Sequence, residues 1–309
     1  MIAHAMSQLA TELDQHRQAL FGLCYRMLGS AADADDLVQD TFRRALERPP
    51  KDTTAPLRPW LVTVATRLCI DALRKRRREK YFGPWLPGPI ETEKVVRDLE
   101  PGPDARYDLV ESASLAFLIA LEALDPRQRA TLVLRDVMGL TGPETAEALD
   151  VSPENARVLL HRARKALEGY DQSRRPITPE LAAKVGEALQ RLTLALSRAD
   201  PAAVVDLLSE DVLTVHDGGG DYIAAVRPVA GREQVLELYR NIAALGRLPE
   251  RVAIRELNGL PALMAVYAES GRYAPRATVS LHLDAQGRID RIWTTVNERK
   301  LTGVPFPGA

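Results

Sequence analysis

Residues 141–167 read TGPETAEALDVSPENARVLLHRARKAL, and this stretch decides the fold of the first half of the chain. Thr141, with Glu144 three residues later, predicts a capped helix start, and Ser152-Pro153 predicts a second start after a short turn. The apolar residues of the second helix recur at helical spacing and are expected to pack inward: Ala156, Leu160, Ala163 and Leu167. The stretch therefore predicts two short helices joined by a tight turn.

The outer face of the second helix is expected to be basic, since it carries Arg157, His161, Arg164 and Lys165. A helix-turn-helix with a basic second helix has the geometry that enters a DNA major groove. An ordinary helical hairpin with a solvated charged face gives the same pattern, so other segments have to decide between the two.

A second basic segment lies upstream, in a helix expected over residues 57–80. Between Arg67 and Lys80 there are seven basic and two acidic residues, a local charge of +5. Such a density suits the neutralisation of DNA phosphates, and Trp60 on the same helix could stack on an exposed base. The alternatives are a core position for Trp60 and a solvated helix end for the basic run.

An acidic helix precedes this basic one. Ser30 predicts its start and Pro49-Pro50 its end. One face can be shared by Asp36, Gln39, Asp40 and Arg43. An acidic strip cannot be a DNA surface and indicates a basic protein partner, with a solvated helix face as the alternative.

The whole chain has 309 residues and a net charge of −1, so any nucleic-acid signal is local. There is no run of 18 apolar residues to predict a membrane span, and residues 1–6 lack the pattern of a secretory signal. Cys24 and Cys69 are too few for a disulfide framework and are predicted to be buried reduced thiols. The sequence thus indicates a cytoplasmic protein without a metal site or a cofactor.

Proline and glycine divide the chain. Residues 81–108 are rich in both and are predicted to be a semi-rigid linker without a regular helix. Helices return at 109–124, and Asp125-Pro126 predicts another capped start. Arg174-Arg175-Pro176 marks a second boundary.

The last part of the chain changes from helical to strand periodicity. Helices are expected over 178–198, 201–209 and 231–245. Strands are expected over 212–216, 222–229, 252–257, 262–268, 277–284 and 289–296. This order predicts an α+β domain with one curved sheet folded around helices.

Together these segments resemble a bacterial extracytoplasmic-function sigma factor with only sigma domains 2 and 4, over about residues 8–170. The resemblance is carried by DADDLVQDTFRRAL, by PWLVTVATRLCIDALRKRRR and by LDPRQRATLVLRDVMGLTGPETAEALDVSPENARVLLHRARKAL. It implies two all-α domains, domain 2 over 1–80 and domain 4 over 109–172. It also implies a protein without catalytic residues that directs core RNA polymerase to promoters.

The resemblance assigns roles to residues of three helices. It implies that the β′ clamp helices of the polymerase are bound by Asp36, Gln39, Asp40, Phe42 and Arg43, and that the β flap is a further contact. It implies that the −10-type element is read and melted by Trp60, Arg67, Asp71, Arg74, Lys75, Arg76, Arg77 and Arg78. It implies that the −35-type element is read by Ser152, Asn155, Arg157, Val158, His161, Arg162, Arg164 and Lys165. The family's common run Thr-Val-Lys-Ser-Arg-Leu-His-Arg-Ala-Arg is matched here at residues 161–164 but not at 155–159, so the promoter sequence does not transfer.

The linker YFGPWLPGPI, residues 81–90, resembles that of a subgroup with a fused C-terminal SnoaL-like domain, here residues 176–309. The subgroup's DGGGK-type motif stands here as Asp217, Gly218, Gly219, Gly220 and Asp221, with Asp in place of Lys. Its NPDKL-type motif stands here as Asn297-Glu-Arg-Lys300-Leu301. The resemblance implies a regulatory domain that contacts the sigma domains, with an unidentified small ligand as a further possibility.

Two other functions fit parts of the sequence. One is a conventional helix-turn-helix regulator with a ligand-sensing tail, whose cavity Tyr239, Tyr267 and Trp293 could line. The other is an enzyme built on the tail with His216 or His282, because related folds use an Asp/His pair for proton abstraction. Adjacent strand residues point to opposite faces, so His216 and Asp217 are not expected to share a pocket.

Overall fold

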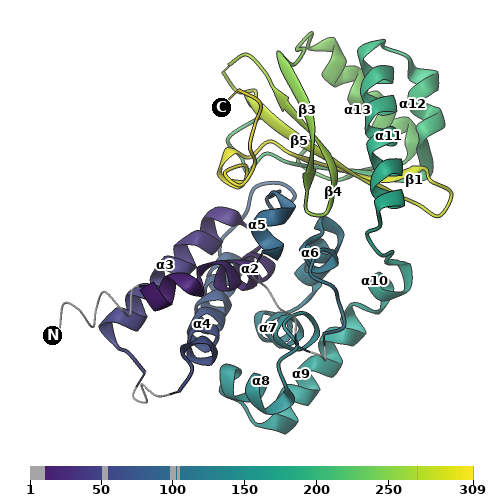
Figure 1. The fold of residues 1–309 in the computed structure, drawn as a ribbon. Helices are drawn as coiled ribbons and strands as arrows, with labels where there is room; N and C mark the ends of the chain where they lie inside the picture. Colours follow the sequence, from purple (N-terminus) through teal and green to yellow (C-terminus); the bar gives the residue numbers. More distant parts are fainter. Residues whose placement is uncertain (1–10, 51–54, 98–101, 103–104, 270, 309) are drawn as a thin grey trace. The chain divides into compact units, whose positions relative to one another are not determined.

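The computed structural model describes residues 11–50, 55–97, 102, 105–269 and 271–308 (Figure 1). The chain divides into two units. Unit 1 contains residues 1–80 and 92–175, and unit 2 contains residues 81–91 and 176–309. None of the helices formed by the described residues is both long and apolar enough to cross a membrane.

Unit 1 begins with three long helices, α2 (Arg17–Leu28), α3 (Ala31–Glu47) and α4 (Leu57–Arg78), which pack against one another. The Ser30 side chain accepts a hydrogen bond from the backbone N–H of Asp33 and so caps α3, as the sequence predicts. Cys24 and Cys69 are free and buried between these helices, as predicted. Apolar residues at helical spacing predict a first helix over residues 6–28, and residues 6–10 of it lie outside the described residues.

The predicted linker over 81–108 needs correction. Residues 92–96 form the short helix α5 (Thr92–Val96), and residues 81–91 group with unit 2 rather than bridging two bodies. Part of the predicted segment, residues 98–101 and 103–104, lies outside the described residues.

The second half of unit 1 is built from short helical pieces. These are η1 (Glu111–Ala113), α6 (Leu115–Ala120), η2 (Leu121–Ala123), α7 (Pro126–Leu132), the π-turn η3 (Val133–Val137), α8 (Gly142–Leu149), α9 (Pro153–Ala166) and α10 (Glu168–Ser173). Capping boxes at Asp125 and Thr141, and the Ser152 cap of α9, confirm the predicted helix starts. Helix α4 packs against α7 and α8 as well as against α2 and α3.

Unit 2 is a curved mixed sheet of six strands with helices on one face. The helices are α11 (Pro179–Ser197), α12 (Pro201–Leu207) and α13 (Arg232–Ala244), with the short turn η4 (Glu298–Lys300). The strands are β1 (Leu208–Asp217), β2 (Val229–Ala230), β3 (Arg251–Leu257), β4 (Leu260–Val266), β5 (Arg276–Leu283) and β6 (Ile289–Thr295). Their order is β2-β1-β6-β5-β4-β3, and only the β1–β6 pair is parallel among the described strands. The α+β prediction is confirmed.

The two faces of the sheet carry separate cores, because successive strand residues point to opposite sides. On one face Leu281 and Ile292 pack with apolar residues of α11, α12 and α13. On the other face Ala262 and Met264 pack with Leu301 and with residues near the C-terminus. The strand expected over 222–229 is wrong, since only its last residue enters the short strand β2.

Candidate DNA-binding surfaces and the strap site

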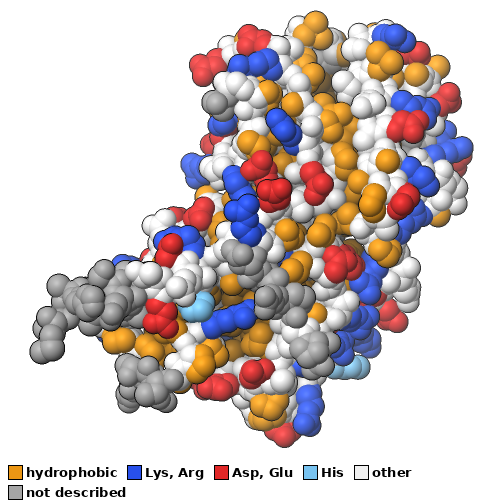
Figure 2. Space-filling model, viewed as in Figure 1, with side chains coloured by type: hydrophobic (Ala, Val, Ile, Leu, Met, Phe, Trp, Pro, Cys, Tyr) orange, Lys and Arg blue, Asp and Glu red, His pale blue; other side chains and the backbone are white. Residues whose placement is uncertain are grey.

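Helix α9 presents most of its polar residues to solvent. Ala156, Ala163 and Leu167 are buried as expected, but Leu159 is buried where Leu160 was predicted, and Leu160 is half-buried. The predicted −35 residues that are exposed are Ser152, Asn155, Arg157, Val158, His161, Arg162 and Lys165. Figure 2 shows Lys and Arg side chains gathered along the edge of unit 1 that α9 forms. This face can therefore meet DNA phosphates and base edges.

Arg164 has a structural partner. Its Nε and Nη2 donate to the two carboxylate oxygens of Asp136 at 2.9 and 2.6 Å, and Asp136 is buried. The Asp136 hydrogen bonds raise the pKa of Arg164. This bidentate pair ties α9 to the π-turn η3, so Arg164 fixes the position of α9. A DNA contact by Arg164 stays a prediction.

Helix α4 places the residues predicted for the −10-type element along its length. Trp60 is half-buried, and Arg67, Asp71, Arg74, Lys75, Arg77 and Arg78 are exposed. Arg74 pairs with Asp71 at 3.3 Å. Lys75 lies 3.9 Å from Glu79. Exposed pairs of this kind are weak, so they leave these side chains available to DNA.

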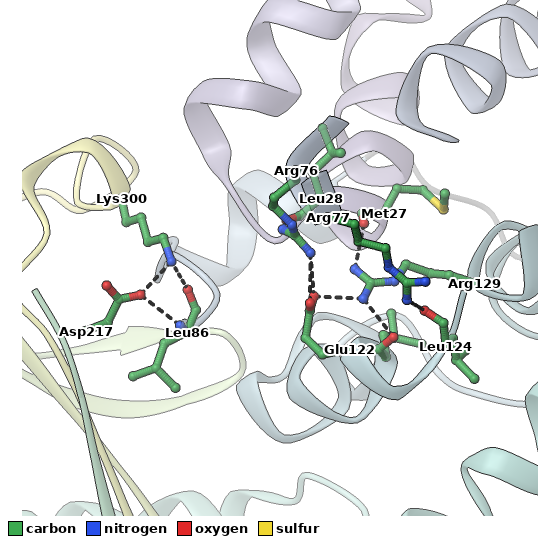
Figure 3. Close-up of polar contacts among 11 residues, drawn as sticks. Met27, Leu28, Arg76, Arg77, Leu86, Glu122, Leu124, Arg129, Asp217 and Lys300 are labelled. Atoms are coloured by element: carbon green, nitrogen blue, oxygen red, sulfur yellow. Dashed lines mark hydrogen bonds and ion pairs between the residues drawn. The ribbon is translucent and has the colours of Figure 1, made fainter. Parts of the chain in front are cut away.

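The C-terminal end of α4 already contacts domain 4. Arg76 donates through Nη2 to both carboxylate oxygens of Glu122 at 2.9 and 2.8 Å, and through Nη1 to the Leu28 carbonyl at 2.8 Å (Figure 3). Arg77 donates to the Leu124 carbonyl. Nearer the middle of α4, Arg67 Nε donates to the Ala148 carbonyl of α8 at 3.3 Å. Three arginines predicted to contact DNA thus donate hydrogen bonds to protein groups in this structure: Arg67, Arg76 and Arg77.

Glu122 joins a second arginine to the first. Arg129 is buried and donates to Glu122 Oε1 at 2.7 Å, to the Leu121 carbonyl at 2.7 Å and to the Met27 carbonyl at 2.9 Å (Figure 3). Burial lowers the pKa of Arg129, and the Glu122 carboxylate opposes that shift. We call Arg76, Glu122 and Arg129 the Glu122 bridge. Its carboxylate is shared between a domain 2 arginine and a domain 4 arginine.

The acidic face of α3 is exposed at Asp36, Gln39 and Arg43, and Asp40 is half-buried and pairs with Arg43 at 2.9 Å. Phe42 differs, because its side chain is buried in unit 1 with the Arg17 guanidinium 5.0 Å from its ring centroid. Phe42 therefore packs α3 against the rest of unit 1, and polymerase contacts by all five residues stay a prediction.

The motifs predicted for the tail meet in unit 2 around the linker. We call residues 81–91 the strap and Asp217, Asn297 and Lys300 the strap site. Asp217 is fully buried and accepts hydrogen bonds from the Tyr81 hydroxyl and from the Leu86 backbone N–H, the latter at 2.8 Å. Asn297 Nδ2 donates to the Tyr81 hydroxyl at 3.0 Å. Three segments far apart in sequence are thus held together by one carboxylate.

Lys300 supplies the positive charge of the strap site. Its Nζ donates to Asp217 Oδ2 at 2.5 Å and to the Leu86 carbonyl at 2.6 Å (Figure 3). The same ammonium lies 4.7 Å from the Tyr81 ring centroid and 4.2 Å from that of Trp85. Burial, together with the hydrogen bond to Asp217, raises the pKa of Tyr81, so its hydroxyl stays protonated and donates. The strap therefore wraps a buried ion pair with aromatic rings.

The triple glycine allows this close approach. Gly219 and Gly220 have φ of 63° and 89°, and a Cβ on Gly219 would lie 2.2 Å from Asn297 Nδ2. The Gly219 N–H also donates to Asp217 Oδ1 at 3.1 Å. Asp221, which replaces the subgroup's usual Lys, is exposed. The motif thus serves the strap, a contact that the sequence could not specify.

The far end of the strap joins the sheet edge. The Ile90 N–H donates to Asn258 Oδ1 at 3.1 Å, and the Asn258 N–H donates to the Ile90 carbonyl at 2.9 Å. Glu91 forms a bridge with Leu257. The strap is therefore anchored to unit 2 at both ends.

His216 lies on the opposite face of β1 from Asp217, as strand alternation predicts. Its Nε2 lies 3.0 Å from Thr214 Oγ1, and its ring lies 6.4 Å from that of Tyr239. His282 pairs with Asp290 at 2.6 Å on another strand. The structure does not bring His216 and Asp217 together, so this pair cannot act as the acid and base of one pocket.

The buried histidine predicts acid sensitivity. Burial lowers the pKa of His216 from 6.5 to about 4. Between these pH values the unfolded chain binds a proton that the native unit does not, so stability falls as the pH drops through this window, by about 3 kcal/mol in total. Thermal melts of the full chain at pH 7.5 and pH 5 should show a smaller loss for His216→Gln than for the wild type. The exposed His161→Gln is the control, and equal losses in all three proteins would contradict the prediction.

Sequence reasoning missed the two buried arginines and Glu122. Arg26 and Arg129 are both buried, but in sequence Arg129 lies in a charged stretch and Arg26 in an apolar helix, and neither stretch shows which groups the arginine contacts. The one available signal was the placement of Arg26 and Arg129 at core-facing helical spacings.

Comparisons with known proteins identify the family of the chain. The Sigma-70 region 2 family model matches residues 13–79, and the Sigma-70, region 4 model matches residues 114–167. The chain is 34% identical to the ECF RNA polymerase sigma factor SigJ of Mycobacterium tuberculosis, over 96% of this chain and 94% of the relative. It is 35% identical to SigG of the same species, over 65% of this chain and 59% of the relative.

The crystal structure of Mycobacterium tuberculosis SigJ superposes with a TM-score of 0.68 at 27% identity and covers 99% of this chain and all of that one. The likeness therefore extends through both units. The chain belongs to the extracytoplasmic-function RNA polymerase sigma factors.

Proposed function

We propose that this protein is a promoter-specificity subunit that binds core RNA polymerase through α3 and promoter DNA through α4 and α9. The observation that carries the proposal is the presence, in one unit, of an exposed acidic helix face, a basic helix end and a solvent-facing recognition helix. The net charge of −1 fits a subunit that binds DNA weakly by itself and depends on the polymerase for most of the affinity.

We further propose that unit 2 modulates this activity through the strap. The strap directly follows the basic end of α4 in sequence, so its attachment to Asp217 and Lys300 constrains the chain that leaves α4. The support for this role is that the tail motifs converge on the strap.

Run-off transcription tests the main proposal. Core polymerase supplied with this protein should start transcripts at a defined promoter, and the protein alone should bind that promoter poorly in a gel shift. Tight binding by the protein alone, without transcripts when core enzyme is added, would favour the conventional regulator instead.

Recognition by α9 gives a residue-level prediction. Arg157→Ala or Arg162→Ala should weaken promoter binding of the holoenzyme by about 1–3 kcal/mol, because each removes a candidate base or phosphate contact. The control is Arg127→Ala, which removes an exposed positive charge from α7 in the same domain. Filter binding of wild-type and −35-mutated promoters measures the effect, and equal affinities for all variants would refute the role of α9.

A further inference from the structure

The contact between α4 and domain 4 cannot persist when both promoter elements are read. The −10 and −35 elements lie 25 positions apart, which is roughly 85 Å at about 3.4 Å per base pair. In this structure Arg67 of α4 lies 3.3 Å from the Ala148 carbonyl of α8, the first helix of the helix-turn-helix. Domain 4 therefore has to leave α4 before both elements are engaged.

Each arginine of the Glu122 bridge has a hydrogen-bond partner within its own domain that would survive the separation of the domains. If domain 4 leaves, Arg129 keeps Glu122 and the Leu121 carbonyl, which belong to its own domain, and loses the Met27 carbonyl of domain 2. Arg76 keeps the Leu28 carbonyl of its own domain and loses the Glu122 carboxylate. Arg129 and Glu122 keep each other as opposite charges, and Arg76, which loses its carboxylate, is partly exposed to water. This contact can therefore open without leaving a buried charge unpaired.

The exposed fractions of the side chains show which arginine can exchange its partner. The side chains of Arg76 and Glu122 are 27% and 34% exposed, whereas that of Arg129 is 3% exposed. Water or a phosphate can therefore reach the Arg76 side, while the Arg129 side stays closed. A carboxylate that binds a guanidinium through both oxygens has the geometry of a phosphate on the same group.

We infer that Glu122 occupies the phosphate position of Arg76 in the free protein and so holds domain 4 closed on the basic end of α4. The contact is an autoinhibitory latch, and a DNA phosphate replaces the carboxylate when the domains separate on the promoter. This inference rests on the proposed function, because it assumes that α4 meets promoter DNA.

The variant Glu122→Gln tests the latch in the full chain. It keeps a hydrogen-bond acceptor but removes the charge that holds Arg76. The matched control is Glu147→Gln, which makes the same charge change at an exposed position of α8. Fluorescent labels on Glu47→Cys and Glu168→Cys, both exposed positions, report the separation of the domains by energy transfer, since the two native cysteines are buried.

If the latch exists, Glu122→Gln lowers energy transfer in the free protein and tightens binding to core polymerase by about two- to fivefold, the range for a partly exposed ion pair. Glu147→Gln should match the wild type in both measurements. Unchanged energy transfer and unchanged affinity in a folded Glu122→Gln protein would overturn the inference.

A second variant guards against misfolding, because Glu122→Gln leaves the buried Arg129 without its carboxylate. Glu122→Gln with Arg129→Gln removes both charges and should give the same opening and the same tighter binding. If this folded double variant stays closed, the latch is refuted. Failure of the proposed function looks different, since the wild type itself would then neither bind core polymerase nor yield transcripts.

Discussion

Replacing Asp217 with Asn is expected to detach the strap from unit 2. The change leaves the Lys300 ammonium buried without its carboxylate, and loss of one partner of a buried pair costs about 3–5 kcal/mol. It also weakens the acceptor that the Tyr81 hydroxyl and the Leu86 N–H share. Cleavage of the full chain by chymotrypsin should accelerate within the strap, where Phe82 is already exposed.

Two further variants decide whether the ion pair is the cause. Asp221→Asn alters an exposed carboxylate of the same glycine motif and should leave strap cleavage and melting temperature unchanged. Asp217→Asn combined with Lys300→Met removes both charges, so it should recover part of the lost stability. Wild-type cleavage rates in the single variant Asp217→Asn would show that the strap is held by other contacts.

The single variant Asp217→Asn also tests whether the strap regulates transcription. If the strap transmits the influence of unit 2, Asp217→Asn should change the transcript yield of the holoenzyme while Asp221→Asn does not. A cleavable strap with an unchanged transcript yield would leave the strap as a structural attachment only.

Local chemistry explains what the sequence could predict. The helix starts at Asp125, Thr141 and Ser152 depend on hydrogen bonds within three residues, so a one-dimensional pattern contains all of their partners. The hairpin of β5 and β6 follows from period-two alternation and a short turn, where Asp284 accepts from the Gln286 and Arg288 N–H groups.

Long-range polar contacts explain what it could not. Asp217 and Leu86 are separated by 131 residues, and Arg76 and Glu122 by 46, so neither pair leaves a periodic trace. The strand expected over 222–229 failed for a related reason, because apolar alternation alone does not supply a neighbouring strand. The tail motifs were found in the sequence, but their shared partner, the strap, required the fold.

Arg26 is the second residue whose change should have a large effect. Its side chain is fully buried in α2, and its guanidinium joins three carbonyls and one hydroxyl. It donates to the carbonyls of Gly22, Val95 and Leu109 at 2.9, 3.0 and 2.7 Å, and to Ser112 Oγ at 2.8 Å. Burial lowers its pKa to about 10, so it remains charged at neutral pH. One side chain thus ties both α5 and the start of η1 to α2.

Arg26→Met is therefore expected to lower the stability of unit 1 by about 3–5 kcal/mol, because several buried acceptors lose their donor at once. Arg26→Lys keeps the charge but lacks the planar fork, so it should recover only part of the loss. Arg44→Met, at an exposed position of α3, is the matched control and should change stability by no more than about 0.5 kcal/mol. Urea unfolding measures the stability of the variants.

Hydrogen exchange at residues 109–113 gives the local readout of the same change. These amides should exchange faster in Arg26→Met than in Arg44→Met, since the Leu109 carbonyl and Ser112 lose the group that holds them to α2. Equal exchange in the two variants would mean that apolar packing around η1, rather than the guanidinium, holds this segment. Faster exchange confined to this segment would instead show that the buried Arg26 guanidinium holds residues 109–113 against α2.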